Sequence, residues 1–182
     1  MTAKCRELFC ATLFSMRVLG VDCGTEYTGY GVVELCTDGK LVCLTCGAIK
    51  LSARDPLPAR LATIFERLGR LIEEHHPHNV AIEDVFYAVN VKSALKLGQV
   101  RGVAMLAASW AGLDVAEYAP LTVKSAVAGY GKAEKTQVQH MVMRLLNLHG
   151  PPLGADAADA LAIAICHIHT ASTTKRYHLA HS

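Results

Sequence analysis

Four acidic side chains stand at the ends of apolar segments in this sequence. Asp22 and Glu83 each close a short apolar run, while Asp156 and Asp159 open a long one. A carboxylate at the end of a buried strand is costly to desolvate unless a cation, hydrogen bonds or a metal ion compensates its charge. Carboxylate oxygens are the ligands that Mg²⁺ prefers. Gathered into one cluster, these side chains predict metal-assisted cleavage of phosphodiesters.

That chemistry sets the number and placement of the acids. Two divalent ions about 4 Å apart stabilise both the attacking water and the leaving oxygen of an in-line displacement. Three or four carboxylates on rigid elements are needed to hold them, and at least one must bridge. Asp22, on the first strand, is the predicted bridging ligand, with Glu83 and the pair Asp156 and Asp159 on either side.

Each acid also has an ordinary structural explanation. Asp22 could form a turn, since aspartate is a common turn residue, and Glu83 with Asp84 could be a solvated strand end. Asp156 and Asp159 share one face near a helix start, where acids stabilise the helix dipole. The combination favours an active site, because neighbouring parallel strands bring their carboxyl ends together beside that helix.

The elements that must position these acids follow from hydrophobic periodicity and turn residues. Strands are predicted at residues 17–21, 29–35, 41–49, 79–83 and 115–119. Helices are predicted at residues 59–75, 94–110, 120–127, 133–146 and 155–169. An Asp38-Gly39 turn joins the second and third strands, and Ser93 is the expected N-cap of the second helix. The order indicates an α/β fold, a mixed five-stranded sheet with helices on both faces.

The composition fits a single globular domain. The chain has 182 residues, of which 52% are hydrophobic and 19% charged, enough for a sizeable core. The expected organisation is an N-terminal extension over 1–15, a nuclease domain over 16–170 and a flexible tail over 171–182. Met16 is an alternative start, and a short signal peptide is the less favoured explanation of the extension. No apolar run is long enough to span a bilayer.

Charge is unevenly distributed along the chain. The stretch 92–144 has a net charge of +4, and the rest of the chain −2, within a total of +2. A basic region beside an acidic cluster suits a polyanionic substrate next to a metal site. Any single lysine in this stretch would serve equally well on a solvated helix surface.

The cysteines favour a reducing compartment. Seven is an odd number, and they are spread too widely for a secreted disulfide framework, so we expect free thiols in a cytoplasmic protein. Cys43 and Cys46 form a CxxC pattern, yet nothing nearby completes a zinc site. Within a regular strand these two thiols would face opposite sides of the sheet, so packing is the expected role.

The motifs around the acids resemble those of the RuvC family of Holliday-junction resolvases, which have an RNase H-like fold. The resemblance runs from Met16 to about His169. It is carried by five segments: Gly20-Val21-Asp22 with Thr28-Gly29-Tyr30-Gly31-Val32, Ala81-Ile82-Glu83 with Val85-Phe86, Ser93-Ala94-Leu95-Lys96-Leu97-Gly98-Gln99, Ala133-Glu134-Lys135 with Gln137-Val138, and Ala155-Asp156-Ala157-Ala158-Asp159-Ala160-Leu161-Ala162.

The resemblance implies a structure-selective endodeoxyribonuclease of recombination and repair. By this match the four acids are the catalytic residues and the ligands of two Mg²⁺ ions, for which Mn²⁺ substitutes. A homodimer would nick two opposed strands of a four-way junction symmetrically, prefer T-rich sites and leave ligatable 5′-phosphates. It would work with the RuvA–RuvB branch-migration complex in the cytoplasm, with no membrane association. The DNA contacts implied are Phe86, Lys92, Lys124, Lys132 and Lys135.

Three departures from the family pattern stand out. Cys23 replaces a usual proline, Val89 stands where a basic residue is common, and the first fifteen residues have no counterpart.

Three other functions are less favoured. The segments Ser93–Gln99 and Ala133–Lys135 argue against an RNase H-like enzyme for structured RNA. An actin-like kinase, suggested by Asp22-Cys23-Gly24-Thr25, needs a duplicated domain for which 182 residues leave no room. A junction-binding protein without catalysis would have no reason to keep all four acids. Phe86 could also fold back on the core instead of stacking on bases.

Overall fold

The computed structural model describes residues 15–84 and 91–180. In these ranges the strands are β1 (Met16–Asp22), β2 (Tyr27–Leu35), β3 (Leu41–Lys50), β4 (Asn79–Glu83) and β5 (Asp114–Tyr118). The helices are α2 (Leu57–His75), α3 (Val91–Trp110), α4 (Pro120–Ala128), α5 (Lys135–Leu145) and α6 (Ala155–Ala180). All the predicted strands and helices exist, in the predicted order.

The strands form one mixed sheet in the order β3-β2-β1-β4-β5. β1 pairs antiparallel with β2, and β2 with β3, so the first three strands are a meander. β4 pairs parallel with β1, and β5 parallel with β4. The predicted five-stranded sheet is therefore confirmed, with β1 at its centre and the carboxyl ends of three parallel strands at one edge.

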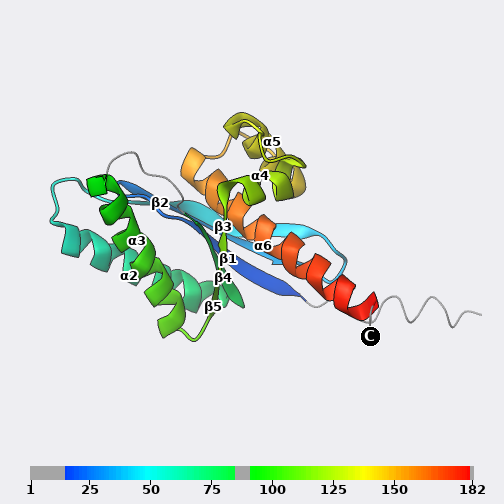
Figure 1. Ribbon diagram of the computed structural model, residues 1–182, viewed down its shortest axis with the longest axis horizontal. Helices are drawn as coiled ribbons and strands as arrows, with labels where there is room; N and C mark the ends of the chain where they lie inside the picture. The colour runs from blue at the N-terminus through cyan, green and yellow to red at the C-terminus, as the bar shows by residue number, and fades with distance from the viewer. Residues whose placement is uncertain (1–14, 85–90, 181–182) are drawn as a thin grey trace, which may run out of the picture.

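Helices cover both faces of this sheet (Figure 1). On one face α4, α5 and α6 enclose a core that includes Val18, Val33 and Leu161. On the other face α2 and α3 enclose a second core that includes Leu19 and Ile64. Alternation along β1 explains the two cores, because Val18 and Leu19 point to opposite faces.

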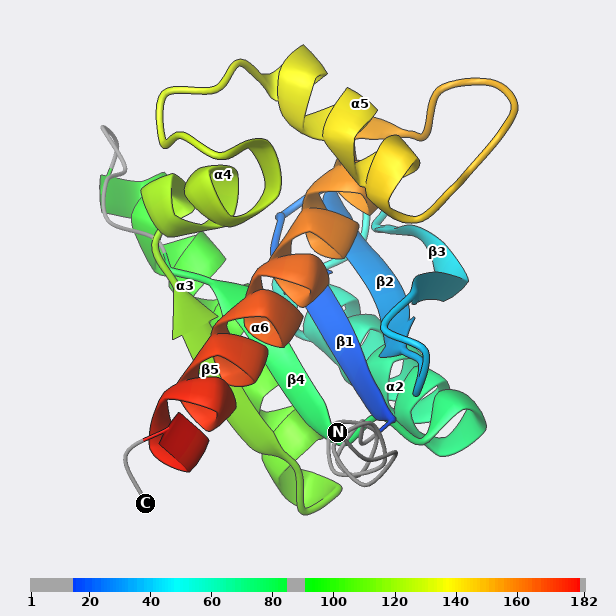
Figure 2. The same ribbon diagram turned by 90° about the vertical axis from the view of Figure 1, so that its right-hand side faces the viewer.

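Helix α6 lies directly across β1 and β2 (Figure 2). Its alanine-rich sequence allows a close approach, and the strands contribute glycines at the contact. A Cβ atom at Gly20 would lie 2.0 Å from the carbonyl oxygen of Ala160, and one at Gly31 would lie 2.6 Å from the Leu161 side chain. Side chains at positions 20 and 31 would push the helix away from the sheet, so glycine there sets the spacing of the two layers.

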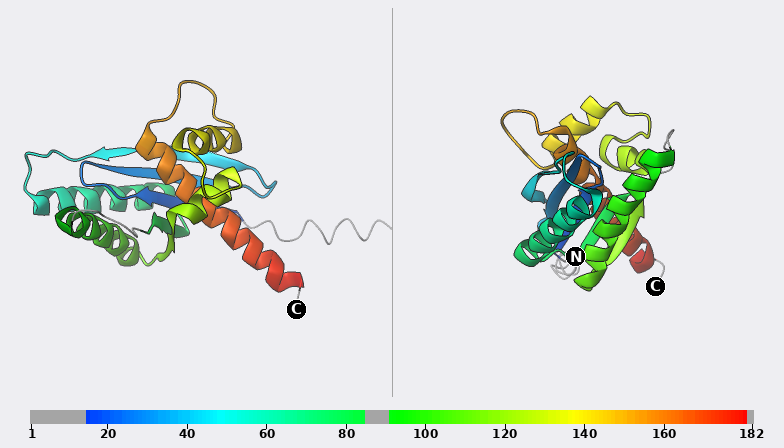
Figure 3. Two further views of the ribbon diagram at one scale, coloured as in Figure 1. Left: turned by 45° about the horizontal axis from the view of Figure 1, so that its top comes forward. Right: turned by 90° about the vertical axis from the view of Figure 1, so that its left-hand side faces the viewer.

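Two helix boundaries differ from the predictions. Helix α3 begins at Val91, so Ser93 lies inside its first turn and is not the N-cap. Helix α6 continues to Ala180, well beyond the predicted end at His169, and projects past the sheet (Figure 3). The hydroxyls of Thr170, Thr173 and Thr174 donate to carbonyl oxygens one turn earlier. The hydrogen-bonding groups of these threonine side chains are therefore satisfied within the helix, and the polar residues do not end it.

The predicted placement of Cys43 and Cys46 on opposite sides of the sheet is wrong. The β2–β3 register shifts between Val32 and Val33, which pair with Thr45 and Cys43, so Leu44 is an extra bulged residue. The bulge cancels one step of the alternation, and both thiols pack against the core under α6. A hydrogen bond from Cys43 lowers the pKa of Cys46 to about 7. The predicted packing role is retained.

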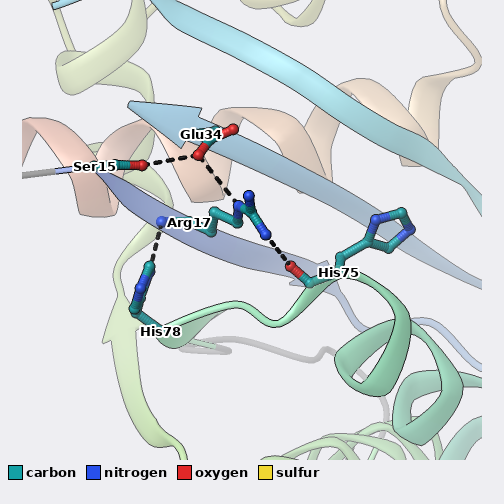
Figure 4. A network of polar contacts seen from close by, with 5 residues as sticks. All are labelled: Ser15, Arg17, Glu34, His75 and His78. Carbon is teal, nitrogen blue, oxygen red and sulfur yellow. Dashed lines mark hydrogen bonds and ion pairs between the residues drawn. The ribbon is translucent and has the colours of Figure 1, made fainter. Parts of the chain in front are cut away.

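A polar network anchors the start of β1, at the end of the strand opposite Asp22 (Figure 4). The Arg17 side chain donates hydrogen bonds to the Glu34 carboxylate at 3.2 Å and to the carbonyl oxygen of His75 at 3.1 Å. The Arg17 backbone N–H donates to His78 at 2.9 Å. Ser15 donates to Glu34 at 2.8 Å, so ordered contacts begin one residue before the predicted domain start.

Candidate active site

The two central acids lie side by side at the carboxyl edge of the sheet. Val21 of β1 pairs in parallel register with Ile82 of β4, so Asp22 and Glu83 are the next residues on the two strands. Asp22 also pairs with Gly29 of β2. The parallel pairing predicted from the apolar runs therefore brings these two carboxylates to one place.

The beginning of α6 supplies the other two acids. Asp156 lies in its first turn, and Asp159 follows on the same helical face. Gly29 allows this helix end to rest on the sheet, since a Cβ at position 29 would lie 2.1 Å from the Asp156 carbonyl oxygen. Gly29 is the pairing partner of Asp22, so the helix start is placed beside Asp22.

The electrostatics of Asp22 unite the four acids in one cluster. Burial, followed by the charges of Asp159, Glu83 and Asp156, raises the pKa of Asp22 to about 7. Burial and then the charge of Asp159 also raise the pKa of Glu83. A carboxyl group whose ionisation is this unfavourable lacks sufficient positive charge nearby. A bound cation would supply that charge and favour the ionised form.

Two lysines predicted to contact DNA lie next to the acids. Lys135 at the start of α5 forms an ion pair with Asp159, with 2.5 Å between Nζ and Oδ2. Its charge also opposes the rise in the pKa of Asp22. Lys124 on α4 lowers the pKa of Glu83. Both ammonium groups are therefore close enough to the cluster to act on a phosphate bound there.

The other predicted DNA contacts are less closely placed or lie outside the described residues. Lys92 is exposed on the first turn of α3, and Lys132 is exposed between α4 and α5. Phe86 falls in 85–90, outside the described ranges, and so does Val89.

Arg101 is not among the site residues predicted from the sequence. This side chain, on α3, forms ion pairs with Asp84 at 3.2 Å and with Glu117 of β5. The available signal was weak. Arg101 is the lone charged residue in the stretch 97–113, and a single charge in an apolar helix requires a buried partner.

The donor set of the site fits a hard divalent cation such as Mg²⁺. It consists of four carboxylates, and oxygen is the atom such ions prefer. The thiol of Cys23, next to Asp22, is kept protonated because burial and the charge of Asp22 raise its pKa to about 12. Within residues 15–84 and 91–180, no three histidine, cysteine or acidic side chains already form a group that could hold a metal ion.

The sheet order, with acids closing two adjacent parallel strands and opening the helix across them, defines a nuclease of RNase H-like fold. The sequence matches the family described as crossover junction endodeoxyribonuclease RuvC over residues 18–167. The chain belongs to this family of Holliday-junction endonucleases, and the predicted family and fold are confirmed. The family consists of metal-dependent nucleases.

The similarity extends over most of the chain. A crossover junction endodeoxyribonuclease RuvC of Koribacter versatilis is 66% identical over 163 residues, covering 90% of this chain and 98% of the relative. The structure of Thermus thermophilus RuvC superimposes with a TM-score of 0.81 at 35% identity, over 87% of this chain and 97% of that one. The structure of T. thermophilus RuvC in complex with Holliday junction substrate superimposes with a TM-score of 0.80 at 33% identity, over 87% of this chain and 96% of that one.

Proposed function

We propose that this protein resolves four-way DNA junctions by hydrolysing one phosphodiester in each of two opposed strands. The observation that carries the proposal is the convergence of Asp22, Glu83, Asp156 and Asp159 at one sheet edge, with lysines beside them. A structural relative with the same fold has been solved with a Holliday junction. The products would be ligatable nicks with 5′-phosphates.

The four acids would hold two Mg²⁺ ions, with Mn²⁺ as a substitute. Bound ions would activate a water molecule and stabilise the leaving oxygen. The charges of all three other acids act on Asp22, so in this proposal it would be the bridging ligand. Lys124 and Lys135 would neutralise the scissile or flanking phosphate and position it against the acids.

Further DNA contacts would surround this centre. Lys92 and Lys132 are exposed and would bind phosphates of the junction arms. Phe86 would stack on a base at the crossover, where stacking is worth about 1–3 kcal/mol. Phosphate contacts set the position of the DNA, so any preference for T-rich sites must come from contacts with bases.

Cleavage of two strands requires two active sites, and helix α3 offers the surface for a homodimer. Apolar side chains stand exposed along it at Val91, Leu95, Leu106 and Trp110, the last by 81%. Gly98 and Gly102 lie exposed between them, with nothing within 4 Å of a Cβ built on either. This spacing forms one helical stripe. A second copy of the chain, packing its own α3 on this stripe about a two-fold axis, would give two symmetric sites.

The cellular setting is part of the same proposal. We expect the dimer to act in the cytoplasm together with the RuvA–RuvB branch-migration complex. No helix in the described parts of the chain is long and apolar enough to cross a membrane.

The deciding experiment compares a synthetic four-way junction with a linear duplex of the same sequence, in Mg²⁺. Paired nicks at symmetric positions on the junction alone are the expected result. Asp22→Asn should abolish cleavage while leaving junction binding intact, and Asp38→Asn, on the exposed β2–β3 hairpin, is the matched control. Equal cutting of both substrates would overturn the proposal, as would binding without cleavage by the natural protein.

A further inference from the structure

Arg101 reaches from α3 to the rim of the acid cluster. Its side chain is 18% exposed and forms ion pairs with the carboxylates of Asp84 and Glu117. It lies on the face of α3 that packs on the sheet, together with the buried Val100 and Ala104. A largely buried guanidinium is stable there because two carboxylates share its charge.

Both partners of Arg101 adjoin the candidate metal ligands. Asp84 directly follows Glu83, and its backbone N–H donates to the Tyr118 carbonyl at 2.8 Å. Glu117 pairs with Ile82, the residue before Glu83. The charge of Arg101 also acts on the thiol of Cys23, the residue after Asp22. Arg101 therefore lies next to the segments that follow both central acids.

Without Arg101 this sheet edge would present two further carboxylates without a paired cation, besides the four candidate ligands. Asp84 and Glu117 have the same hard oxygen donors as the four candidate ligands. Free of a partner, they would compete for a divalent ion at the wrong place. A guanidinium remains protonated at every physiological pH, and here one of its nitrogens, Nη2, contacts both carboxylates. It is therefore suited to keep two acids permanently occupied.

We propose that Arg101 is a positioning residue that withholds Asp84 and Glu117 from divalent cations and thereby restricts metal binding to Asp22, Glu83 and the α6 acids. The inference rests on the proposed function, because it concerns the same metal site. It adds a determinant of metal selectivity outside the acids, and it connects α3 with Asp84, the residue after Glu83.

Titration of the full-length protein with Mn²⁺, followed by electron paramagnetic resonance of the free ion, tests this inference without DNA. Arg101→Gln should bind additional Mn²⁺ per protomer, and the half-saturating Mg²⁺ concentration for junction cleavage should rise by about 10- to 100-fold. Junction affinity should not change. Arg70→Gln removes an arginine that pairs with Glu66 on the surface of α2 and is the matched control. It should titrate like the natural protein.

Two further variants keep the test decisive. Arg101→Lys retains the charge but not the planar guanidinium, and should give an intermediate Mn²⁺ stoichiometry if Arg101→Gln does not fold. The triple variant Arg101→Gln, Asp84→Asn, Glu117→Gln removes the competing acids and should restore the natural stoichiometry. A folded Arg101→Gln or Arg101→Lys protein that binds the same number of Mn²⁺ ions per protomer as the natural protein would overturn the inference. If the natural protein does not cleave junctions, the proposed function fails, whereas the stoichiometry still reports on Arg101.

Discussion

Gly29 and Asp156 meet where β2 passes under the start of α6, and a Cβ at position 29 would lie 2.1 Å from the Asp156 carbonyl oxygen. Because Gly29 is also the pairing partner of Asp22, this one contact sets how closely the helix-borne acids approach the strand-borne ones.

Gly29→Ala should therefore disable the site. Backbone cannot move aside as a flexible side chain can, so the added methyl group must displace the start of α6 and Asp156 with it. We expect junction cleavage to fall by about 100-fold, as for misplaced catalytic groups, with circular dichroism showing retained helix content. Gly69→Ala is the control. Its Cβ meets nothing within 4 Å on α2, and the change should stabilise the protein by about 0.5–1 kcal/mol. Full activity of Gly29→Ala would show that Asp156 need not be placed this closely.

The raised pKa of Asp22 predicts how stability depends on pH in the metal-free protein. The folded state holds the Asp22 proton up to about pH 7, whereas the unfolded chain releases it near its ordinary value of 3.8. Between these values the folded state binds more protons, so the free energy of unfolding decreases as pH rises and levels off above about 7. The contribution lost is on the order of 4 kcal/mol.

Asp22→Asn cannot titrate at this position and should reduce this decrease, leaving the part that comes from the raised pKa of Glu83. Urea denaturation in EDTA at pH 5 and pH 8 measures the effect as the difference between the natural protein and the variant. The variant should be the more stable protein at pH 8. If the free energy of unfolding depended on pH equally in the two proteins, the pKa of Asp22 would not be the raised one in the cluster.

Lys124→Ala should weaken cleavage and reduce the salt dependence of junction binding. Each phosphate contact contributes about 0.9 to the slope of log affinity against log salt, so loss of one contact should lower the slope by about that amount. Fluorescence anisotropy over a range of salt concentrations measures it. Lys40→Ala, on the exposed β2–β3 turn where Lys40 pairs with Asp38, should leave the slope unaltered. An unchanged slope for Lys124→Ala would place this lysine away from the DNA.

Trp110→Glu should convert the proposed dimer into a monomer. A charge within an apolar interface loses its hydration without gaining a partner, which costs several kcal/mol. Sedimentation equilibrium should show the monomer, and junction cleavage should lose its pairing of nicks. Val42→Glu places the same charge on an exposed side chain of β3 and should remain dimeric. A dimeric Trp110→Glu protein would require another interface.

Local sequence patterns were enough to predict the elements that carry the site. The boundaries of β4 agree with the prediction at both ends. Its apolar run lies between Pro77 and two acids, which limit where the strand can begin and end. Helix ends were harder to predict. The polar residues from Ser172 suggested a frayed tail, but the hydroxyls of Thr170, Thr173 and Thr174 donate to carbonyl oxygens of the preceding turn, and α6 continues. The bulge at Leu44 left no recognisable signal, since register is a property of two strands.

The sequence alone determined the family, the order of elements and the acids to consider, because apolar periodicity and the motifs around the acids are local features. Only the tertiary structure decided which charges meet. Lys135 pairs with Asp159, and Arg101 pairs with Asp84 and Glu117, through contacts between elements far apart in the chain. Such pairs depend on how closely two layers approach. Here that distance is set by glycines under α6, whose missing side chains show their effect only once the helix lies on the sheet.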